Sequence, residues 1–190
     1  MKRIQNEKLK GFVILSIFLS ITTILFAQKC KYEVNEVDKF TGELTKITKP
    51  EKIIVSYFIS GDFSFKKAGE NHSIILDYYI SSYKKFDPFN IEKGARLVLL
   101  LENGESINLS TPDNIIGTKR VVVGIPPTHI CTLKNISYPI NKSQIDMLIQ
   151  SKVVSVRFYR SEGNGKESYE DANISEKHQQ ELKNLIMCIL

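Results

Sequence analysis

Three cysteines are the residues of this chain best suited to covalent chemistry: Cys30, Cys131 and Cys188. They form no Cys-x-x-Cys pair, so the sequence supports neither a zinc ribbon nor a thioredoxin-like site. Cys30 and Cys188 lie towards the two ends of the chain, and the ends of a domain often lie close together. In an oxidising compartment we therefore predict a Cys30–Cys188 disulfide. Pairings through Cys131 and three free thiols stay open, and Cys131 in an apolar strand is most simply a small core residue.

The histidines, serines and carboxylates show no recognisable catalytic spacing. His129 and Cys131 share one side of a predicted strand, but a metal site needs further ligands that the sequence does not identify. No serine lies in a Gly-x-Ser-x-Gly elbow. Carboxylate pairs for glycoside hydrolysis can be assembled in several ways, from Asp62, Asp77, Glu102 or Glu105. Asp77 stands out inside an apolar run, with the outer face of a strand as its simpler interpretation. We assign no catalytic residue, no cofactor and no metal ligand.

One cluster combines aromatic and basic side chains and is the candidate binding patch. It consists of Tyr78, Tyr79, Tyr83, Lys84, Lys85 and Phe86. Such a cluster can contact a glycan, a single strand of nucleic acid or a lipid surface. Core packing at a solvated strand end is the simpler explanation of the tyrosines.

The elements that must position these residues are mostly short strands, because turn signals recur at short intervals. The Asn103-Gly104 pair between two β-prone runs is the strongest hairpin signal. Gly61-Asp62 is expected to break one strand, and Gly163-Asn164-Gly165 to form a hairpin tip. The predicted strands are 31–37, 43–47, 52–60, 63–67, 72–82, 96–101, 106–110, 120–125, 128–136, 153–160 and 166–169.

Two helices are expected in the last third of the chain. Asn141 can cap the first, with Gln144 three residues further on, and this helix should end near Ser151. The second opens at 173–176 and carries one apolar stripe, made of Leu182, Leu185, Ile186 and Ile189. The predicted fold class is α+β: a mostly antiparallel β-sheet or open barrel, one short internal helix and a C-terminal amphipathic helix.

The first 27 residues have the composition of an export signal. Lys2, Arg3, Lys8 and Lys10 precede an uncharged apolar run, residues 11–27, that ends in Ala27. The run is also nearly long enough to span a bilayer, so residues 1–27 are a signal peptide or an N-terminal membrane anchor. Residues 28–190 then form a single β-rich globular domain. We expect a periplasmic, outer-envelope or secreted location, or attachment by one N-terminal transmembrane helix.

Most of the net charge belongs to this leader. The chain has 26 basic and 21 acidic residues, and the leader holds four of the basic residues and one acidic residue, Glu7, which leaves 22 against 20. A surface with nearly equal numbers of positive and negative charges gives no reason to expect nucleic acid as a partner. We expect an unknown protein or envelope macromolecule as partner, with membrane contact only through residues 1–27 if they are not cleaved.

Both ends of the remaining chain carry a resemblance. Cys30-Lys31-Tyr32 with Phe40-Thr41-Gly42, and Tyr138-Pro139-Ile140 followed by Val156-Arg157-Phe158, resemble segments of certain small exported bacterial proteins of unknown function. The resemblance implies an envelope or secreted location and carries no activity.

Three functions remain open at this point. The favoured one is a non-catalytic binding or interaction module. The alternatives are an extracytoplasmic hydrolase with a spatially assembled site, and a membrane-anchored structural or assembly factor. A deep cleft with clustered Asp, His or Ser would favour the enzyme, and a flat aromatic patch would favour binding.

Overall fold

The computed structural model describes residues 30–161 and 166–190. The predicted leader, residues 1–27, and the predicted hairpin tip at Gly163-Asn164-Gly165 lie outside the described residues. Residues Lys31–Leu190 form one compact unit, to which the following description applies.

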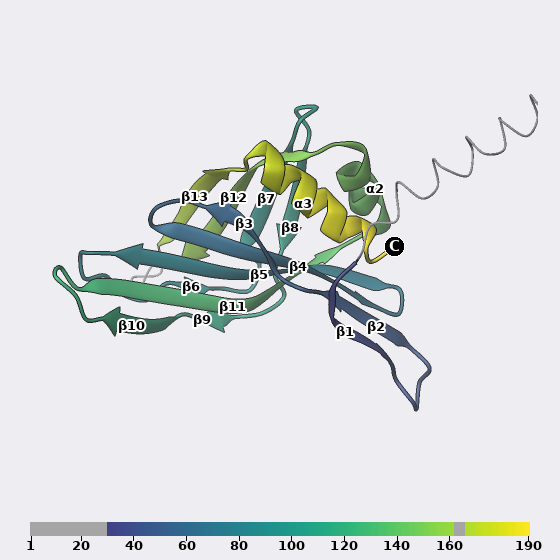
Figure 1. Cartoon of the computed structure of the whole chain (residues 1–190), viewed down its shortest axis with the longest axis horizontal. Coiled ribbons are helices and arrows are strands. Elements are labelled where there is room, and N and C mark those ends of the chain that lie inside the picture. Colours follow the sequence, from purple (N-terminus) through teal and green to yellow (C-terminus); the bar gives the residue numbers. More distant parts are fainter. Residues whose placement is uncertain (1–29, 162–165) are drawn as a thin grey trace, which may run out of the picture. The chain divides into compact units, whose positions relative to one another are not determined.

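Two antiparallel sheets build this unit (Figure 1). Sheet A has seven strands in the order β1-β2-β4-β5-β11-β10, and β3 pairs with the part of β4 that β2 leaves free. Long paired strands in its centre arise from alternating apolar residues, which give each strand one buried face. The strands are β1 (Tyr32–Val37), β2 (Leu44–Thr48), β3 (Glu51–Val55), β4 (Ile59–Ala68), β5 (Asn71–Ser82), β10 (Thr118–Val122) and β11 (Thr128–Ile140).

Sheet B has six strands in the order β8-β7-β12-β6-β9, with β13 paired to β12. The Asn103-Gly104 hairpin is confirmed: Gly104 has a φ of 87°, and its N–H donates to the Leu101 carbonyl. Only glycine enters this left-handed region at little cost. The strands are β6 (Asn90–Ile91), β7 (Arg96–Leu101), β8 (Ser106–Ser110), β9 (Ile115–Ile116), β12 (Val153–Ser161) and β13 (Glu167–Asn173).

Several strand boundaries differ from the sequence-based expectation. β10 ends at Val122 and not at residue 125, β13 runs on past residue 169 to Asn173, and the short strands β6 and β9 were not expected. The chain turns at Ser56, and β4 continues through Gly61, so the expected break at Gly61-Asp62 is wrong. A Cβ on Gly61 would lie 3.0 Å from Cδ1 of Ile54, so this glycine permits close strand packing and does not make a turn. β11 also runs on past residue 136 to Ile140, through a register shift that includes Asn135 at a φ of 57°.

Both helices form where their patterns predict them. In α2 (Lys142–Gln150) the Asn141 side chain accepts from the Gln144 N–H and the Gln144 side chain accepts from the Asn141 N–H, which is a closed capping box. α3 (Glu176–Met187) buries its apolar stripe against β3, β4, β12 and α2. The α+β class with a mostly antiparallel sheet, one short internal helix and a C-terminal helix is therefore confirmed.

The core joins the two sheets to these helices. Tyr78 of β5 and Phe158 of β12 are both fully buried, and their ring centroids lie 4.3 Å apart. Cys131 is a free, buried thiol as predicted. Burial raises the pKa of the Cys131 thiol, which keeps it in the unreactive protonated form at neutral pH.

Cys30 and Cys188 form the predicted disulfide. Beside it, the Tyr32 hydroxyl donates to the Cys188 carbonyl at 2.7 Å and so holds β1 to the end of α3. Among the described residues, no helix is both long and apolar enough to traverse a bilayer.

Candidate functional site

Three chain turns meet at one end of sheet A, at the left of Figure 1. They are the β3–β4 turn, the segment after β5, and the loop from β10 to β11. The Ser81 N–H donates to the Phe58 carbonyl at 2.7 Å, which joins the first turn to β5. His129 lies opposite both Ser82 and Val121, which places the third loop next to the second.

The side chains at this place are apolar and exposed. Val123 is 95% exposed and Ile125 105%, so neither packs against the part of the domain that the structure describes. Tyr57 is 78% exposed. Proline at 126 and 127 has no N–H for a strand ladder, which helps keep this apolar run in a loop. We call this surface the apolar end; its residues are Val55, Tyr57, Phe58, Tyr83, Val121, Val122, Val123 and Ile125.

The aromatic part of the apolar end is held in place by its own contacts. The hydroxyl oxygens of Tyr57 and Tyr83 lie 2.9 Å apart. The ring of Phe58 stands edge-on to both tyrosines, with centroids 4.6 Å from Tyr57 and 5.8 Å from Tyr83. The hydrogen bond with Tyr57 raises the pKa of the Tyr83 hydroxyl. These aromatic rings are therefore ordered before any partner arrives, which lowers the entropy cost of binding.

Basic residues flank the apolar end. Lys84, Lys85 and Arg120 are exposed. Lys119 donates to the Phe86 carbonyl and lies over the Phe86 ring, with Nζ 5.5 Å from the ring centroid.

The structure divides the candidate binding patch that the sequence indicates. Tyr83, Lys84 and Lys85 lie exposed at the apolar end. Tyr78 instead belongs to the core, because side chains alternate along β5. The remaining two residues are half-buried: Tyr79 points to the outer face of sheet A, and Phe86 stacks on Phe89 with ring centroids 5.3 Å apart.

Sequence reasoning missed the larger part of this surface. The pattern of residue types predicts Tyr57 and Phe58 inside a strand, and the residues from Val121 to Ile125 inside another. The signal that could have found the valine run is its position directly before two prolines, where an apolar stretch leaves the sheet and loses its cover.

A second candidate lies on the outer face of sheet A. Asp62 and Asp77 are direct cross-strand partners on β4 and β5, in a hollow of about 350 Å³. Burial, and to a smaller extent Asp77, raise the pKa of the Asp62 carboxyl, whereas Lys52 opposes the shift. Oδ1 of Asp62 has no hydrogen-bond partner within the described part of the chain. Asp77 accepts from the Asn135 N–H at 2.7 Å. The register thus brings together two of the four carboxylates considered from sequence.

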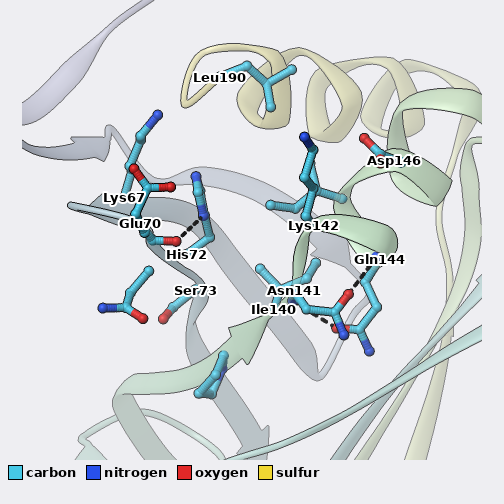
Figure 2. Close-up of a pocket in the computed structure, with 13 residues that line it drawn as sticks. Lys67, Glu70, His72, Ser73, Ile140, Asn141, Lys142, Gln144, Asp146 and Leu190 are labelled. Carbon is cyan, nitrogen blue, oxygen red and sulfur yellow. Dashed lines mark hydrogen bonds between the residues drawn. The ribbon is translucent and has the colours of Figure 1, made fainter.

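A wide cavity of about 950 Å³ lies between β5 and the start of α2 (Figure 2). In Figure 2, His72 and Glu70 lie across it from Lys142 and Asp146. Nδ1 of His72 is 3.1 Å from the Glu70 carbonyl, and the amide groups of Asn141 and Gln144 are used in the capping box. Because charges of both signs line this wide space and the amide groups of Asn141 and Gln144 are already used, the cavity shows no single ligand chemistry.

A Ser–His–Glu series occurs at the start of α3. Oγ of Ser175 lies 3.0 Å from Nδ1 of His178, and Nε2 of His178 lies 3.8 Å from the Glu181 carboxylate. Ser175 occupies the N-cap position of α3, and these residues line neither the 950 Å³ cavity nor the hollow at Asp62. A nucleophile also needs a place for the substrate carbonyl and donors for its oxyanion, which the geometry here does not supply.

The outer face of sheet B carries mutually paired charged and aromatic side chains beside Val98 and Leu100. Arg157 donates two hydrogen bonds to Asp171, at 2.6 and 2.7 Å, and lies over the ring of Tyr169. Its hydrogen bond lowers the pKa of the Asp171 carboxyl. Arg96 covers the ring of Tyr159, with Cζ 4.0 Å from the centroid. These side chains satisfy one another across a hollow of about 390 Å³.

The fold and these surfaces define the protein as an α+β domain of two antiparallel sheets, with a disulfide and an exposed apolar end. The chain matches no protein-family model, no curated protein and no solved structure. Only the chain's own residues therefore bear on its function.

Proposed function

We propose that residues 28–190 form an exported binding module, which acts by non-covalent contact through the apolar end. The observation that carries this proposal is the full exposure of Val123 and Ile125 beside an ordered aromatic group. Exposed apolar patches of this kind mark interaction sites in soluble proteins. Export is supported by the apolar leader and by the Cys30–Cys188 disulfide, which is typical of oxidising compartments.

The test places a photo-crosslinker at the apolar end. p-Benzoylphenylalanine is introduced in the full chain in place of Tyr57, and in a second protein in place of Phe40. Phe40 is the matched control, because it is an aromatic residue with 99% exposure in the β1–β2 connection. We expect light-dependent adducts with a macromolecule at position 57 and none at position 40. Equal labelling at both positions, or none at either, contradicts the proposal.

A hydrolase is the second candidate, and the Asp62–Asp77 pair is the observation that favours it. A carboxyl group with a raised pKa can serve as a general acid beside an ionised neighbour. The prediction of this alternative is a hydrolytic activity that Asp62→Asn removes and that Val123→Ser leaves unchanged. Such a result in the purified chain would replace the binding proposal.

A further inference from the structure

We propose that the occupant of the apolar end is the surface of an anionic phospholipid bilayer, into which the three turns dip. This inference rests on the proposed function and names the partner of the same surface. It differs from the sequence-based expectation that only residues 1–27 contact a membrane.

The breadth of the surface favours a flat occupant. The apolar end extends from the β3–β4 turn across β5 and β11 to β10. Neighbouring strands lie about 4.8 Å apart, so the surface is on the order of 15 Å wide. An extended peptide added to the free edge of β10 would cover Val121 and leave Tyr57 and Tyr83 in water. A bilayer covers all three turns at once.

The apolar end, with its flanking basic residues, combines the three kinds of side chain that a bilayer surface accommodates. The loop that carries Val123 and Ile125 has no charged residue from Val121 to Thr128. The tyrosines beside it are amphipathic, and tyrosine is enriched at membrane–water interfaces. Exposed basic residues lie beside them at Lys84, Lys85 and Arg120. Apolar, aromatic and basic groups thus match acyl chains, interface and anionic headgroups.

The charge balance separates this occupant from a second copy of the chain. Residues 55–60, 80–87 and 119–129 contain four basic residues and one acidic residue, Asp87. Two such ends placed face to face would repel each other, whereas an anionic surface attracts them. A protein with an acidic rim around an apolar patch is the competing occupant that the experiment must separate.

The absence of tryptophan from the chain supplies a clean probe. Val123→Trp, in the full chain reconstituted into vesicles, reports on the apolar end alone. Phe40→Trp is the control, because it carries the same leader and an equally exposed probe. Each protein is measured in phosphatidylcholine vesicles with and without phosphatidylglycerol, and with lipids brominated on the acyl chains. A third protein adds Lys84→Glu and Lys85→Glu to Val123→Trp.

In anionic vesicles we expect the Val123→Trp protein to show blue-shifted emission and to lose most of its intensity to brominated lipid. The Phe40→Trp protein should show neither change, and the two lysine replacements should abolish both. Equal quenching of the two probes, no quenching of the Val123→Trp protein, or quenching that ignores lipid charge overturns the inference. If the vesicle result is negative while position 57 still crosslinks to a protein, the binding function stands and its partner is that protein.

Discussion

The β10–β11 loop of the apolar end and the outer face of sheet B are both exposed, but their side chains differ in whether they have partners. On sheet B, Arg157 is committed to Asp171 and Arg96 covers Tyr159. At the apolar end, Val123 and Ile125 contact almost only solvent. Side chains that already bind one another would have to break those contacts to bind a ligand. Exposed apolar groups break none, and their removal from water at another apolar surface is favourable in free energy. Exposure therefore marks a binding surface only where the exposed groups lack partners.

Removing the disulfide, which stabilises the domain that carries both surfaces, should give the largest effect on stability. Cys188→Ser removes a cross-link that closes a loop of about 159 residues, and loss of such a bond typically costs about 2–5 kcal/mol. The melting temperature should fall by about 4–20 °C for a domain of this size. Thermal unfolding of oxidised wild type, reduced wild type and the variant provides the measurement. A melting temperature shared by all three would mean that the bond does not stabilise the domain.

A smaller effect on stability is expected at Asp62 of sheet A, whose Oδ1 has no hydrogen-bond partner among the described residues. Asp62→Asn removes one of two like charges placed directly across strands, and this should raise the stability at pH 7 by about 0.2–1 kcal/mol. Because the pKa of Asp62 is raised in the folded state, its charge destabilises the fold only above the ordinary value of 3.8. The gain should therefore disappear below that pH. Asp77→Asn is the matched control, since it removes the other charge of the pair. A gain that persists in acid would contradict the charge explanation.

The smallest effect on stability is expected at Asp171 of sheet B, whose carboxylate is paired with Arg157. The pKa of Asp171 is lowered by Arg157, so its charge stabilises the fold above pH 3.8 and the contribution is lost as the pH falls through the lowered value. Asp171→Asn should lower the melting temperature slightly at pH 7 and leave it unchanged in strong acid. Exposed ion pairs contribute little, and added salt should shrink the difference further. Opposite signs for the Asp62 and Asp171 variants would confirm that the two sheets differ in how their exposed charges are paired.

The features that the sequence predicts correctly are set by near neighbours along the chain. The capping box needs only Asn141 and Gln144, and the β7–β8 hairpin depends on a glycine that tolerates a positive φ. The disulfide is an exception, because its two cysteines lie far apart along the chain. It was predictable because only three cysteines exist and two of them lie towards opposite ends of the chain.

The candidate site was harder to predict because it depends on strand register. The alternation along β5 places Tyr78 inside once Asp77 is outside, so this assignment was within reach of the sequence. The proximity of Asp62 to Asp77, and of Tyr57 to Tyr83, follows from the pairing of β4 with β5. Gly61 was misleading because a glycine serves equally well in a turn and beneath a close side chain such as Ile54.

The Cys30–Cys188 bond also decides how the domain bears a mechanical load. Cys30 is the first described residue after the apolar leader, and β1 behind it is an edge strand held by hydrogen bonds to β2. A pull that enters the chain at the leader reaches the sulfur–sulfur bond before it reaches β1. Tension is then passed to the end of α3, so β1 is spared from being peeled away from β2.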